Sequence, residues 1–465
     1  MLDVEVIVAS NRGPVSFVFD KQNRPVVSSS GGGLAGTLKK LLLGRGASWV
    51  ACAMGEADSQ ASKSGLAAAE AGEGIDLAMV DMDSTTYHMA YDTVANATLW
   101  FLHHHMMDLS RVPRFGVRWM EAWSGYREYN RIFSDEICQM AGEGAVVLVQ
   151  DYHLSLLPGM LAKARPDLKV VHFFHTPFAS PEFFRALPDT AAREIVTAMA
   201  TAKSCGFHSS KWADSYLRSC VDTASIQPSS FVSSLGVDTE SLHTEVESER
   251  CIEAKSWVEN IADGRSLIVR TDRMEPSKNI LRGLWAFDEL LSEHPEWVER
   301  VIFLVLTYPS RQNLPEYLAY ASEVETTADY LNDKWSTRSW SPVVLDTSDD
   351  YYRSLAALSL YDVLMVNPVR DGLNLVAKEG PIINERHGSL VLSREAGTFS
   401  ELQAAVTGVN PYDIGETSTG LHEALTLGLT ERAARASQLA KLASLRTPED
   451  WLDDQLSQAL AIRTI

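Results

Sequence analysis

The chain has 465 residues, of which 45% are hydrophobic and 22% charged, and its formal net charge is −20. A chain of this length and composition is expected to form two or three globular domains. The negative charge argues against nucleic acid and against an anionic membrane surface as partners, although a few local Arg and Lys residues can still hold a small phosphorylated ligand.

The five cysteines are widely spaced and form no CxxC pair. This spacing argues against a disulfide scaffold or a zinc site and agrees with a reducing compartment. No signal-type segment and no apolar run of about 18 residues occur, so a cytoplasmic protein without a membrane span is expected. Whether chains associate into a homo-oligomer is left open.

Short apolar runs rich in Val and Ile recur along the chain and alternate with segments of helical periodicity. This alternation predicts buried parallel strands with helices on both faces. One predicted helix, over 280–291, has its apolar residues on one face, and Ser277 is placed to cap it. The predicted strands are Val4–Ala9, Trp49–Ala53, Ala145–Val149, Val170–Phe174, Leu267–Val269, Val301–Leu306, Val363–Val366 and Leu390–Leu392.

The pattern fits an α/β protein with two doubly wound parallel-sheet domains facing a central cleft. The first domain is expected over 1–242 and the second over 243–448, with a polar linker at 243–255. A terminal helix in 449–465 is expected to pack back on the first domain. Ligands of doubly wound sheets bind at the carboxyl ends of the strands, near helix N-termini.

Polar residues follow several predicted strands in the first half of the chain. Arg12 comes directly after the first strand, and a glycine-rich stretch at 31–36 opens a helix. Residues 151–153 and 175–178 follow two later strands. An Arg at such a position can pair with a phosphate, and glycines at a helix N-terminus let backbone approach one. Each feature alone is equally typical of a surface loop, a turn or a buried histidine.

The second half repeats this arrangement. Arg273 and Lys278 lie between a strand and a helix, and two cations near a helix N-terminus make a diphosphate site. Arg311 follows the next strand. The segment 370–379 combines an Asp-Gly turn with Glu379, a carboxylate that could accept two ribose hydroxyls. An ordinary helix start with an N-terminal Asp explains this segment equally well.

Together, and in order, these segments resemble the trehalose-6-phosphate synthase family of retaining glycosyltransferases, which have two Rossmann-like domains of the GT-B type. The resemblance covers nearly the whole chain. The shared stretches are Ser10-Asn11-Arg12, Gly32-Gly33-Leu34-Ala35, Leu99-Trp100, Asp151-Tyr152-His153-Leu154, Pro181-Glu182, Asp371 to Glu379 and Asn410-Pro411-Tyr412-Asp413.

The resemblance implies a role for each matching residue. Arg273 and Lys278 hold the donor diphosphate, Glu379 holds the ribose, and His175 and Asp371 hold the glucose hydroxyls. The catalytic residues it implies are Asp151, His175, Arg273, Lys278 and Asp371. The donor-binding residues are Gly33, His175, Arg273, Lys278, Asp371, Gly372, Asn374, Leu375 and Glu379. The acceptor-binding residues are Arg12, Tyr91, Trp100, Asp151, Tyr152 and Arg311.

The implied reaction transfers glucose from a nucleoside-diphosphate glucose to glucose 6-phosphate, forming α,α-trehalose 6-phosphate. Asn279 stands where the family usually has Gly, and 381–386 resembles actinobacterial members, some of which use GDP-glucose. The resemblance therefore implies GDP- or UDP-glucose as the donor and leaves the base open. The same stretch also resembles pseudo-glycosyltransferases that couple a nucleotide cyclitol to an aminocyclitol phosphate. A non-catalytic sugar-phosphate sensor is a third alternative.

No metal and no cofactor are expected, because cationic side chains can stabilise the leaving diphosphate. Two segments resemble metal motifs. The Asp81-Met82-Asp83 triplet ends an apolar run and is interpreted as structural. His103, His104 and His105 are consecutive, and consecutive residues on a helix point in different directions, so they do not predict a three-histidine site.

Overall fold

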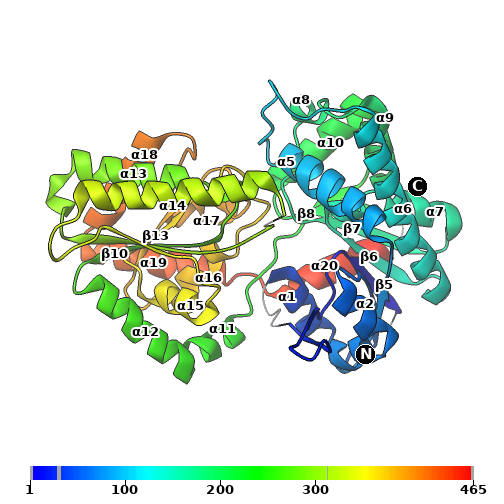
Figure 1. Cartoon of the computed structure of the whole chain (residues 1–465), viewed down its shortest axis with the longest axis horizontal. Coiled ribbons are helices and arrows are strands. Elements are labelled where there is room, and N and C mark those ends of the chain that lie inside the picture. The colour runs from blue at the N-terminus through cyan, green and yellow to red at the C-terminus, as the bar shows by residue number, and fades with distance from the viewer. Residues whose placement is uncertain (1–3, 29–32, 312, 462–465) are drawn as a thin grey trace. The chain divides into compact units, whose positions relative to one another are not determined.

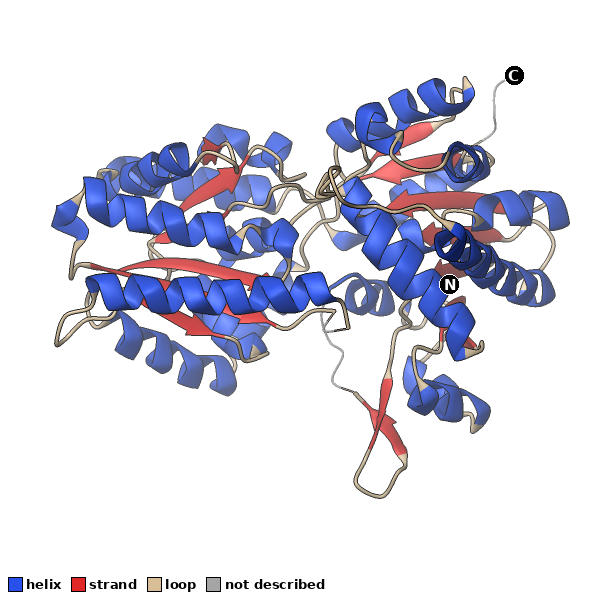
Figure 2. Cartoon of the chain, turned by 45° about the horizontal axis from the view of Figure 1, so that its top comes forward, coloured by secondary structure: helices blue, strands red, loops and turns tan. Residues whose placement is uncertain are grey.

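The structure is a computed structural model that describes residues 4–28, 33–311 and 313–461. The chain divides into two compact units, Met1–Ser233 with Pro448–Ile465, and Ser234–Thr447. In each unit a parallel sheet lies between layers of helices (Figure 1 and Figure 2). The predicted α/β class with two doubly wound sheets is confirmed.

Within the described residues, the first unit has a seven-stranded parallel sheet in the order β5-β4-β1-β6-β7-β8-β9. Val8 in the centre pairs with Trp49 on one side and Leu148 on the other. The strands are β1 Val6–Ser10, β4 Ala47–Cys52, β5 Ile75–Val80, β6 Val146–Gln150, β7 Lys169–Phe174, β8 Ser204–Phe207 and β9 Ser230–Val232. An antiparallel hairpin, β2 Phe17–Phe19 and β3 Pro25–Val27, stands apart from the sheet (Figure 2).

The described part of the second unit has a six-stranded parallel sheet in the order β12-β11-β10-β13-β14-β15. Its strands are β10 Ser266–Arg273, β11 Val301–Tyr308, β12 Val343–Asp346, β13 Val363–Val366, β14 Ser389–Ser393 and β15 Thr407–Val409. In both sheets the strand order reverses beside the first strand, between β1 and β6 and between β10 and β13. Ligands of such sheets bind at this switch point.

Helices connect the strands and cover both faces of each sheet. Those of the first unit are α1 Gly33–Leu42, α2 Glu56–Lys63, α3 Leu66–Ala71, α4 Ser84–Tyr87, the π-helix η1 His88–Leu99, α5 Trp100–His103, α6 Val117–Met140, η2 Tyr152–Leu154, α7 Leu157–Ala164, α8 Pro181–Phe184, α9 Asp189–Met199, α10 Ser210–Ala224 and α20 Pro448–Leu460. Those of the second unit are α11 Thr239–Val246, α12 Glu249–Ala262, η3 Pro276–Lys278, α13 Ile280–Glu293, η4 Pro295–Trp297, α14 Pro315–Trp335, α15 Tyr351–Leu360, α16 Val376–Ile383, α17 Phe399–Leu402, η5 Gln403–Ala405, α18 Ile414–Thr426 and α19 Leu429–Ala443.

The last helix, α20, packs on the sheet of the first unit, where Figure 1 shows it in red beside β6 and β7. Trp451 is fully buried, and its ring centroid lies 5.2 Å from that of Phe173 on β7. Gln455 is also fully buried and accepts a hydrogen bond of 3.2 Å from the side-chain amide of Gln150 at the end of β6. The helix thus brings a polar side chain beneath the carboxyl end of the central strands.

The segment 243–255, expected to be a polar linker, is instead mostly helical and belongs to α11 and α12. Leu242, Val246 and Cys251 pack into the core of the second unit. The division between the units falls at Ser233–Ser234, ahead of the expected boundary at 242–243, because α11 packs with the second unit. The polar faces of these helices dominate the sequence, and their narrow apolar faces leave only a weak periodic signal.

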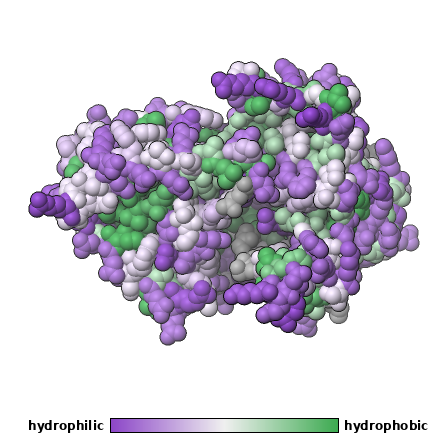
Figure 3. All heavy atoms as spheres, in the orientation of Figure 1, coloured by the Kyte–Doolittle hydropathy of each residue, from purple (hydrophilic) through white to green (hydrophobic). Residues whose placement is uncertain are grey.

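Among the described residues, no helix is both long and apolar enough to cross a membrane. On the face shown in Figure 3, hydrophilic side chains predominate and apolar ones form separate patches. All five cysteines are free, and four of them are buried.

Candidate active site

Arg12 lies just beyond β1, at the switch point of the first sheet. The backbone before it is held in place, because the Asn11 side chain accepts a hydrogen bond of 2.7 Å from the Tyr129 hydroxyl. The Arg12 side chain itself is exposed. Within the described residues its guanidinium forms no ion pair, so it is available to an anion.

Asp151 follows β6 on the other side of this switch point and has φ 66° and ψ 177°. A positive φ is uncommon outside glycine and marks local strain that surrounding contacts must hold. The backbone N–H of Asp151 donates to Phe173 at 2.7 Å, and its carbonyl accepts from His172 Nε2 at 3.0 Å. Its carboxylate accepts from the backbone N–H of His175 at 3.1 Å. Asp151 therefore links the ends of β6 and β7.

The predicted acceptor residues Tyr91, Trp100 and Tyr152 lie on neighbouring elements. Tyr91 is on η1, a π-helix, and its ring stacks on His153 at 5.7 Å. Tyr152 is buried, and its hydroxyl donates to Asn96 of the same π-helix at 2.9 Å. Trp100 is buried directly after that helix. π-Helices are rare and are frequently found at functional sites. No periodic pattern in the sequence predicts this one.

Both ring nitrogens of His175 lie within hydrogen-bond distance of other side chains. Nε2 is 2.9 Å from Gln150 Oε1, and Nδ1 is 3.1 Å from His208 Nε2. Burial holds the pKa of His175 well below its usual value, so the ring is neutral at pH 7. Because Gln150 donates its amide N–H to Gln455, its oxygen faces His175. A glucose hydroxyl binding to this ring would have to compete with one of these contacts.

In the second unit, Arg273 ends β10, and its Nη1 lies 3.0 Å from the buried carboxylate of Glu275. Ser310 also donates to Glu275, at 2.9 Å. Burial alone would raise the pKa of Glu275, but the nearby charges of Arg273 and Arg311 hold it at about 2. Glu275 is therefore ionised, pairs with Arg273 and attracts Arg311. Sequence patterns did not single it out.

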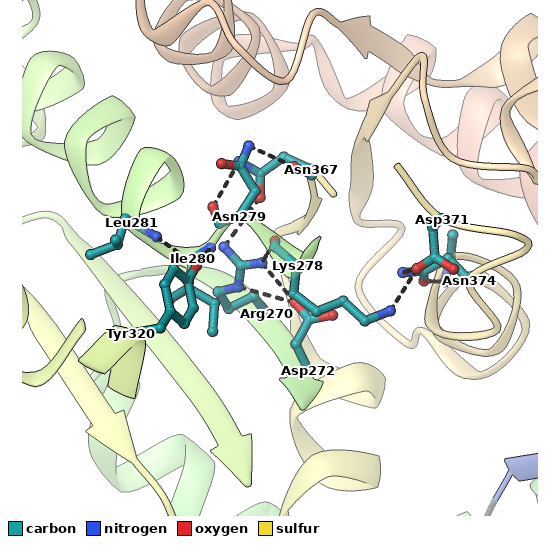
Figure 4. Close-up of polar contacts among 11 residues, drawn as sticks. Arg270, Asp272, Lys278, Asn279, Ile280, Leu281, Tyr320, Asn367, Asp371 and Asn374 are labelled. Carbon is teal, nitrogen blue, oxygen red and sulfur yellow. Dashed lines mark hydrogen bonds and ion pairs between the residues drawn. The ribbon is translucent and has the colours of Figure 1, made fainter. Parts of the chain in front are cut away.

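Lys278 is the last residue of η3, just before α13, and points toward Asp371, with 2.5 Å between Nζ and Oδ2 (Figure 4). Burial lowers the pKa of Lys278, but the charges of Asp371, Asp272 and Glu275 together outweigh burial and raise it, so the amine stays charged. Asn374 donates to the same carboxylate oxygen at 3.1 Å. Asp371 follows β13 directly across the switch point from the end of β10, so the Arg273–Lys278 loop and the Asp-Gly turn meet there.

Arg311 follows β11 and has φ 44°. Its guanidinium contacts the hydroxyl of Tyr317 and lies over the same ring, 5.5 Å from the centroid. The charge of Glu275 raises the pKa of Arg273 above its usual value, against the smaller opposing effects of burial and of repulsion from Arg311. We call Arg273, Lys278 and Arg311 the cationic group.

The segment after Asp371 presents two charged side chains in different environments. Lys378 is buried and bonded to Glu401 and to Ser234, both at 2.8 Å, which makes it a structural residue of the second unit. Glu379 is half-buried, and among the described residues no side chain or backbone group donates a hydrogen bond to its carboxylate. Burial raises the pKa of Glu379 to about 7.

The remaining predicted donor residues lie at the starts of helices. Leu375 precedes α16, and its carbonyl accepts from the backbone N–H of Glu379 at 2.8 Å. Gly372 is buried, and a Cβ on Gly397 would lie 1.9 Å from its carbonyl oxygen. Gly33 begins α1, while Gly31 and Gly32 of the glycine-rich stretch fall outside the described residues.

The two motif-like segments are held by structural contacts. Asp81 pairs with Lys63 at 2.8 Å, and Asp83 caps α4 by accepting from Thr86 N at 2.9 Å. His103 accepts from the backbone of Ala179, and His105 from that of Ser180, both at 3.1 Å.

One other group, His294, Glu296 and His422, places three ligand atoms within 4.8 Å of one another. The rings of His294 and His422 are stacked at 3.5 Å with an interplanar angle of 9°, so their lone pairs do not converge on one point. The indole of Trp297 donates to Nδ1 of His422 at 3.2 Å, which occupies that lone pair. This geometry fits a hydrogen-bonded surface cluster better than a metal centre.

Two Rossmann-like sheets, each with polar residues gathered at its switch point, are the fold of glycosyltransferases of the GT-B class. The chain belongs to glycosyltransferase family 20, whose profile matches residues 4–461, and within it to the trehalose-6-phosphate synthase family. The predicted resemblance is confirmed.

Several relatives support this assignment. The chain is 30% identical over 461 residues to the alpha,alpha-trehalose-phosphate synthase (UDP-forming) of Encephalitozoon cuniculi, covering 97% of both chains. It is 28% identical to the Schizosaccharomyces pombe enzyme of the same name, covering 96% of this chain and 88% of that one. The Burkholderia xenovorans enzyme of that name, solved with glucose-6-phosphate, has the same fold, with a TM-score of 0.84, 22% identity and coverage of 98% and 100%.

Proposed function

We propose that the protein transfers glucose from a nucleoside-diphosphate glucose to glucose 6-phosphate with retention, forming α,α-trehalose 6-phosphate. The observation that carries this proposal is the cationic group at the carboxyl ends of β10 and β11, in a chain whose net charge is −20. Three cations gathered in an acidic protein fit ligands with phosphates. The names of the relatives, all UDP-forming trehalose-phosphate synthases, agree with this reaction.

The second unit is assigned the donor. Arg273 and Lys278 neutralise the diphosphate, Glu379 accepts the ribose hydroxyls, and Asp371 orients the glucose. In the reaction the bond from glucose C1 to the diphosphate oxygen breaks, and a bond from C1 to the acceptor oxygen forms on the same face. The acceptor proton passes to the leaving diphosphate oxygen. Catalysis then comes from stabilising the charge that grows on the leaving group.

The acceptor is assigned to Arg12, Tyr91, Trp100, Asp151 and Tyr152 of the first unit and to Arg311. Phosphate is the group that distinguishes glucose 6-phosphate from glucose, and Arg12 and Arg311 are the cations assigned to it. A cytoplasmic location is also part of the proposal.

A direct test measures release of nucleoside diphosphate from UDP-, GDP- and ADP-glucose, with and without glucose 6-phosphate. We expect release that depends on glucose 6-phosphate, with kcat/KM for GDP-glucose at least equal to that for UDP-glucose. A clear preference for UDP-glucose would contradict only the prediction about the nucleobase of the donor. Turnover only with an aminocyclitol phosphate would favour the cyclitol-coupling alternative, and sugar-phosphate binding without any turnover would favour the sensor.

Activity is expected to persist in excess EDTA, because Arg273 and Lys278 supply the positive charge that a divalent cation supplies in other transferases. The measurement is the steady-state rate before and after chelation, with Mn²⁺ or Mg²⁺ added back. Loss of most activity on chelation, restored by either ion, would contradict the metal-free assignment.

Donor binding near pH 6.5 is expected to release a proton from Glu379. Its pKa of about 7 leaves much of the carboxyl protonated, and ribose hydroxyls that donate to it favour the ionised form. Calorimetry in two buffers of different ionisation enthalpy measures the released proton. Glu379→Gln should abolish the release and weaken donor binding by roughly 10–100-fold. Glu385→Gln, an exposed neighbour paired with Lys255, is the control that should retain both.

The same substitution should change stability in the free protein. The folded-state pKa of Glu379 lies above the value of about 4.3 in an unfolded chain, so the folded protein binds this proton more tightly. The free energy of unfolding that this proton contributes is fully present below about pH 4.3 and is lost as the pH rises through 7. Glu379→Gln should therefore raise the free energy of unfolding by about 2 kcal/mol at pH 8 and change it little at pH 4. Equal effects at both pH values would contradict this linkage.

A further inference from the structure

Beneath the loop that carries Lys278 lies a buried ion pair on β10. Arg270 is fully buried, and its Nε and Nη2 donate to one carboxylate oxygen of Asp272 at 3.1 and 2.7 Å. The two residues are two positions apart on a strand and so lie on the same face of the sheet. Buried ion pairs are weak contributors to stability, since well-packed apolar residues often replace them without loss. Stability alone therefore does not account for this pair.

The remaining donors of Arg270 bind the neighbouring backbone and strand. Nη2 donates to the carbonyl oxygen of Lys278 at 2.7 Å, and Nη1 donates to the side-chain oxygen of Asn367 at 3.1 Å. Asn367 follows β13, just before the turn that contains Asp371. Figure 4 shows the guanidinium between these groups, with the Lys278 side chain extending away toward Asp371. Arg270 thus connects β10, the end of β13 and the backbone of Lys278.

The chain directly after Lys278 is held as well. Asn279 has φ 60°, in the left-handed region that Asn tolerates better than most residues. Its side-chain amide donates to the carbonyl oxygens of Asn367 at 2.9 Å and Pro411 at 2.7 Å. The first amide of α13, that of Ile280, donates to the Tyr320 hydroxyl at 2.7 Å, in the place where Ser277 was expected to cap the helix. Lys278 therefore lies between two fixed segments.

Gly283 on α13 leaves the space that the guanidinium of Arg270 fills. A Cβ at this position would lie 2.6 Å from Arg270 Nη1 and 3.0 Å from Met365 Sδ. A single methyl group would therefore force the guanidinium to move without altering its charge. The position offers a way to displace Arg270 while the ion pair stays chemically intact.

We propose that Arg270 is a positioning residue, which aims the amine of Lys278 at the donor diphosphate by holding the Lys278 backbone through its carbonyl. This inference rests on the proposed function of Lys278. Arg270 itself lies below the loop and is fully buried, so it acts through Lys278. Asp272 orients Arg270, and Gly283 gives it room.

The test compares two variants that disturb Arg270 differently. Gly283→Ala displaces the guanidinium, and Arg270→Met with Asp272→Leu removes the pair without leaving an unpaired buried charge. We expect kcat to fall by about 10²-fold in both, as a misplacement of about 1 Å can cause, with the KM for glucose 6-phosphate unchanged. Binding of GDP and UDP, measured by calorimetry, should weaken. Leu331→Ala, in the core of the same unit, is the control that lowers stability but keeps kcat.

A double-mutant cycle with Lys278→Ala separates positioning from a general structural effect. If Arg270 acts through Lys278, either variant added to Lys278→Ala should lower kcat by less than about 3-fold. A second fall of about 10²-fold in that background would overturn the proposal, as would full kcat in Gly283→Ala. If the parent protein transfers no glucose at all, the proposed function fails. The positioning role then stands or falls on whether Gly283→Ala loses nucleoside diphosphate affinity only when Lys278 is present.

Discussion

Replacing Lys278 or Arg273 by alanine is expected to lower kcat by about 10²–10³-fold, with the KM for glucose 6-phosphate close to that of the parent protein. Both cations face the diphosphate in the proposed function. Negative charge grows on that group as the bond to glucose C1 breaks, so they bind the transition state more strongly than the ground state. Steady-state kinetics with each substrate varied separately measures this difference.

The two cations differ in their contacts, and a third cation of the same unit provides a control. Lys278 is held by Asp371 at 2.5 Å, whereas Arg273 is half exposed and paired with Glu275 at 3.0 Å. Lys334→Ala, which removes an ion pair with Asp288 on other helices of the same unit, is the matched control and should leave kcat unchanged. An increase in KM for the donor with an unchanged kcat would show that these cations bind ground and transition state equally, contrary to the proposal.

The sheet architecture could be predicted because its signals are local. Runs such as Val301–Leu306 are apolar throughout, as expected of strands buried on both faces, and the structure extends this run only to Tyr308. Polar residues directly after such runs mark the carboxyl ends of strands. This is why Arg273 and Asp371, nearly a hundred residues apart, could be expected at one site.

Contacts between distant segments could not be predicted in the same way. The side chain of Gln150 meets Gln455, and His175 meets His208, through packing that no periodic pattern encodes. The resemblance implied that the His175 ring binds hydroxyls of the donor glucose. In the structure both of its ring nitrogens already lie within hydrogen-bond distance of other side chains. If His175 binds the sugar, its hydrogen bond to Gln150, which Gln455 of α20 holds in place, must be broken or shared.

Backbone conformation at the site was also beyond the sequence pattern. Asp151 has a positive φ although no glycine marks the position, because the contacts of its backbone and carboxylate with β7 hold it there. At position 279 the sequence does carry a signal. Asn stands where the family usually has Gly, and its φ of 60° lies in the left-handed region that both residues adopt more easily than others.

Arg311→Ala and Arg12→Ala are expected mainly to raise the KM for glucose 6-phosphate, by roughly 10–100-fold, with little change in kcat. Each substitution removes a charge-assisted contact of about 1.5–3 kcal/mol to a phosphate that is distant from the reacting carbon. Such a contact is made equally in the ground and transition states, so its loss weakens binding and leaves the chemical step intact. The measurement is acceptor KM at saturating donor.

Unphosphorylated glucose provides the internal control for this assignment. It should be a poor acceptor for the parent protein. Arg311→Ala should reduce the ratio of kcat/KM for glucose 6-phosphate to kcat/KM for glucose, because Arg311 contributes only through the phosphate. Tyr317→Phe keeps the ring under the guanidinium but removes the hydroxyl contact, so its effect on KM should be smaller than that of Arg311→Ala. The assignment fails if Arg311→Ala leaves the acceptor KM unchanged while Lys278→Ala raises only that KM, since the two phosphates would then be held by the opposite cations.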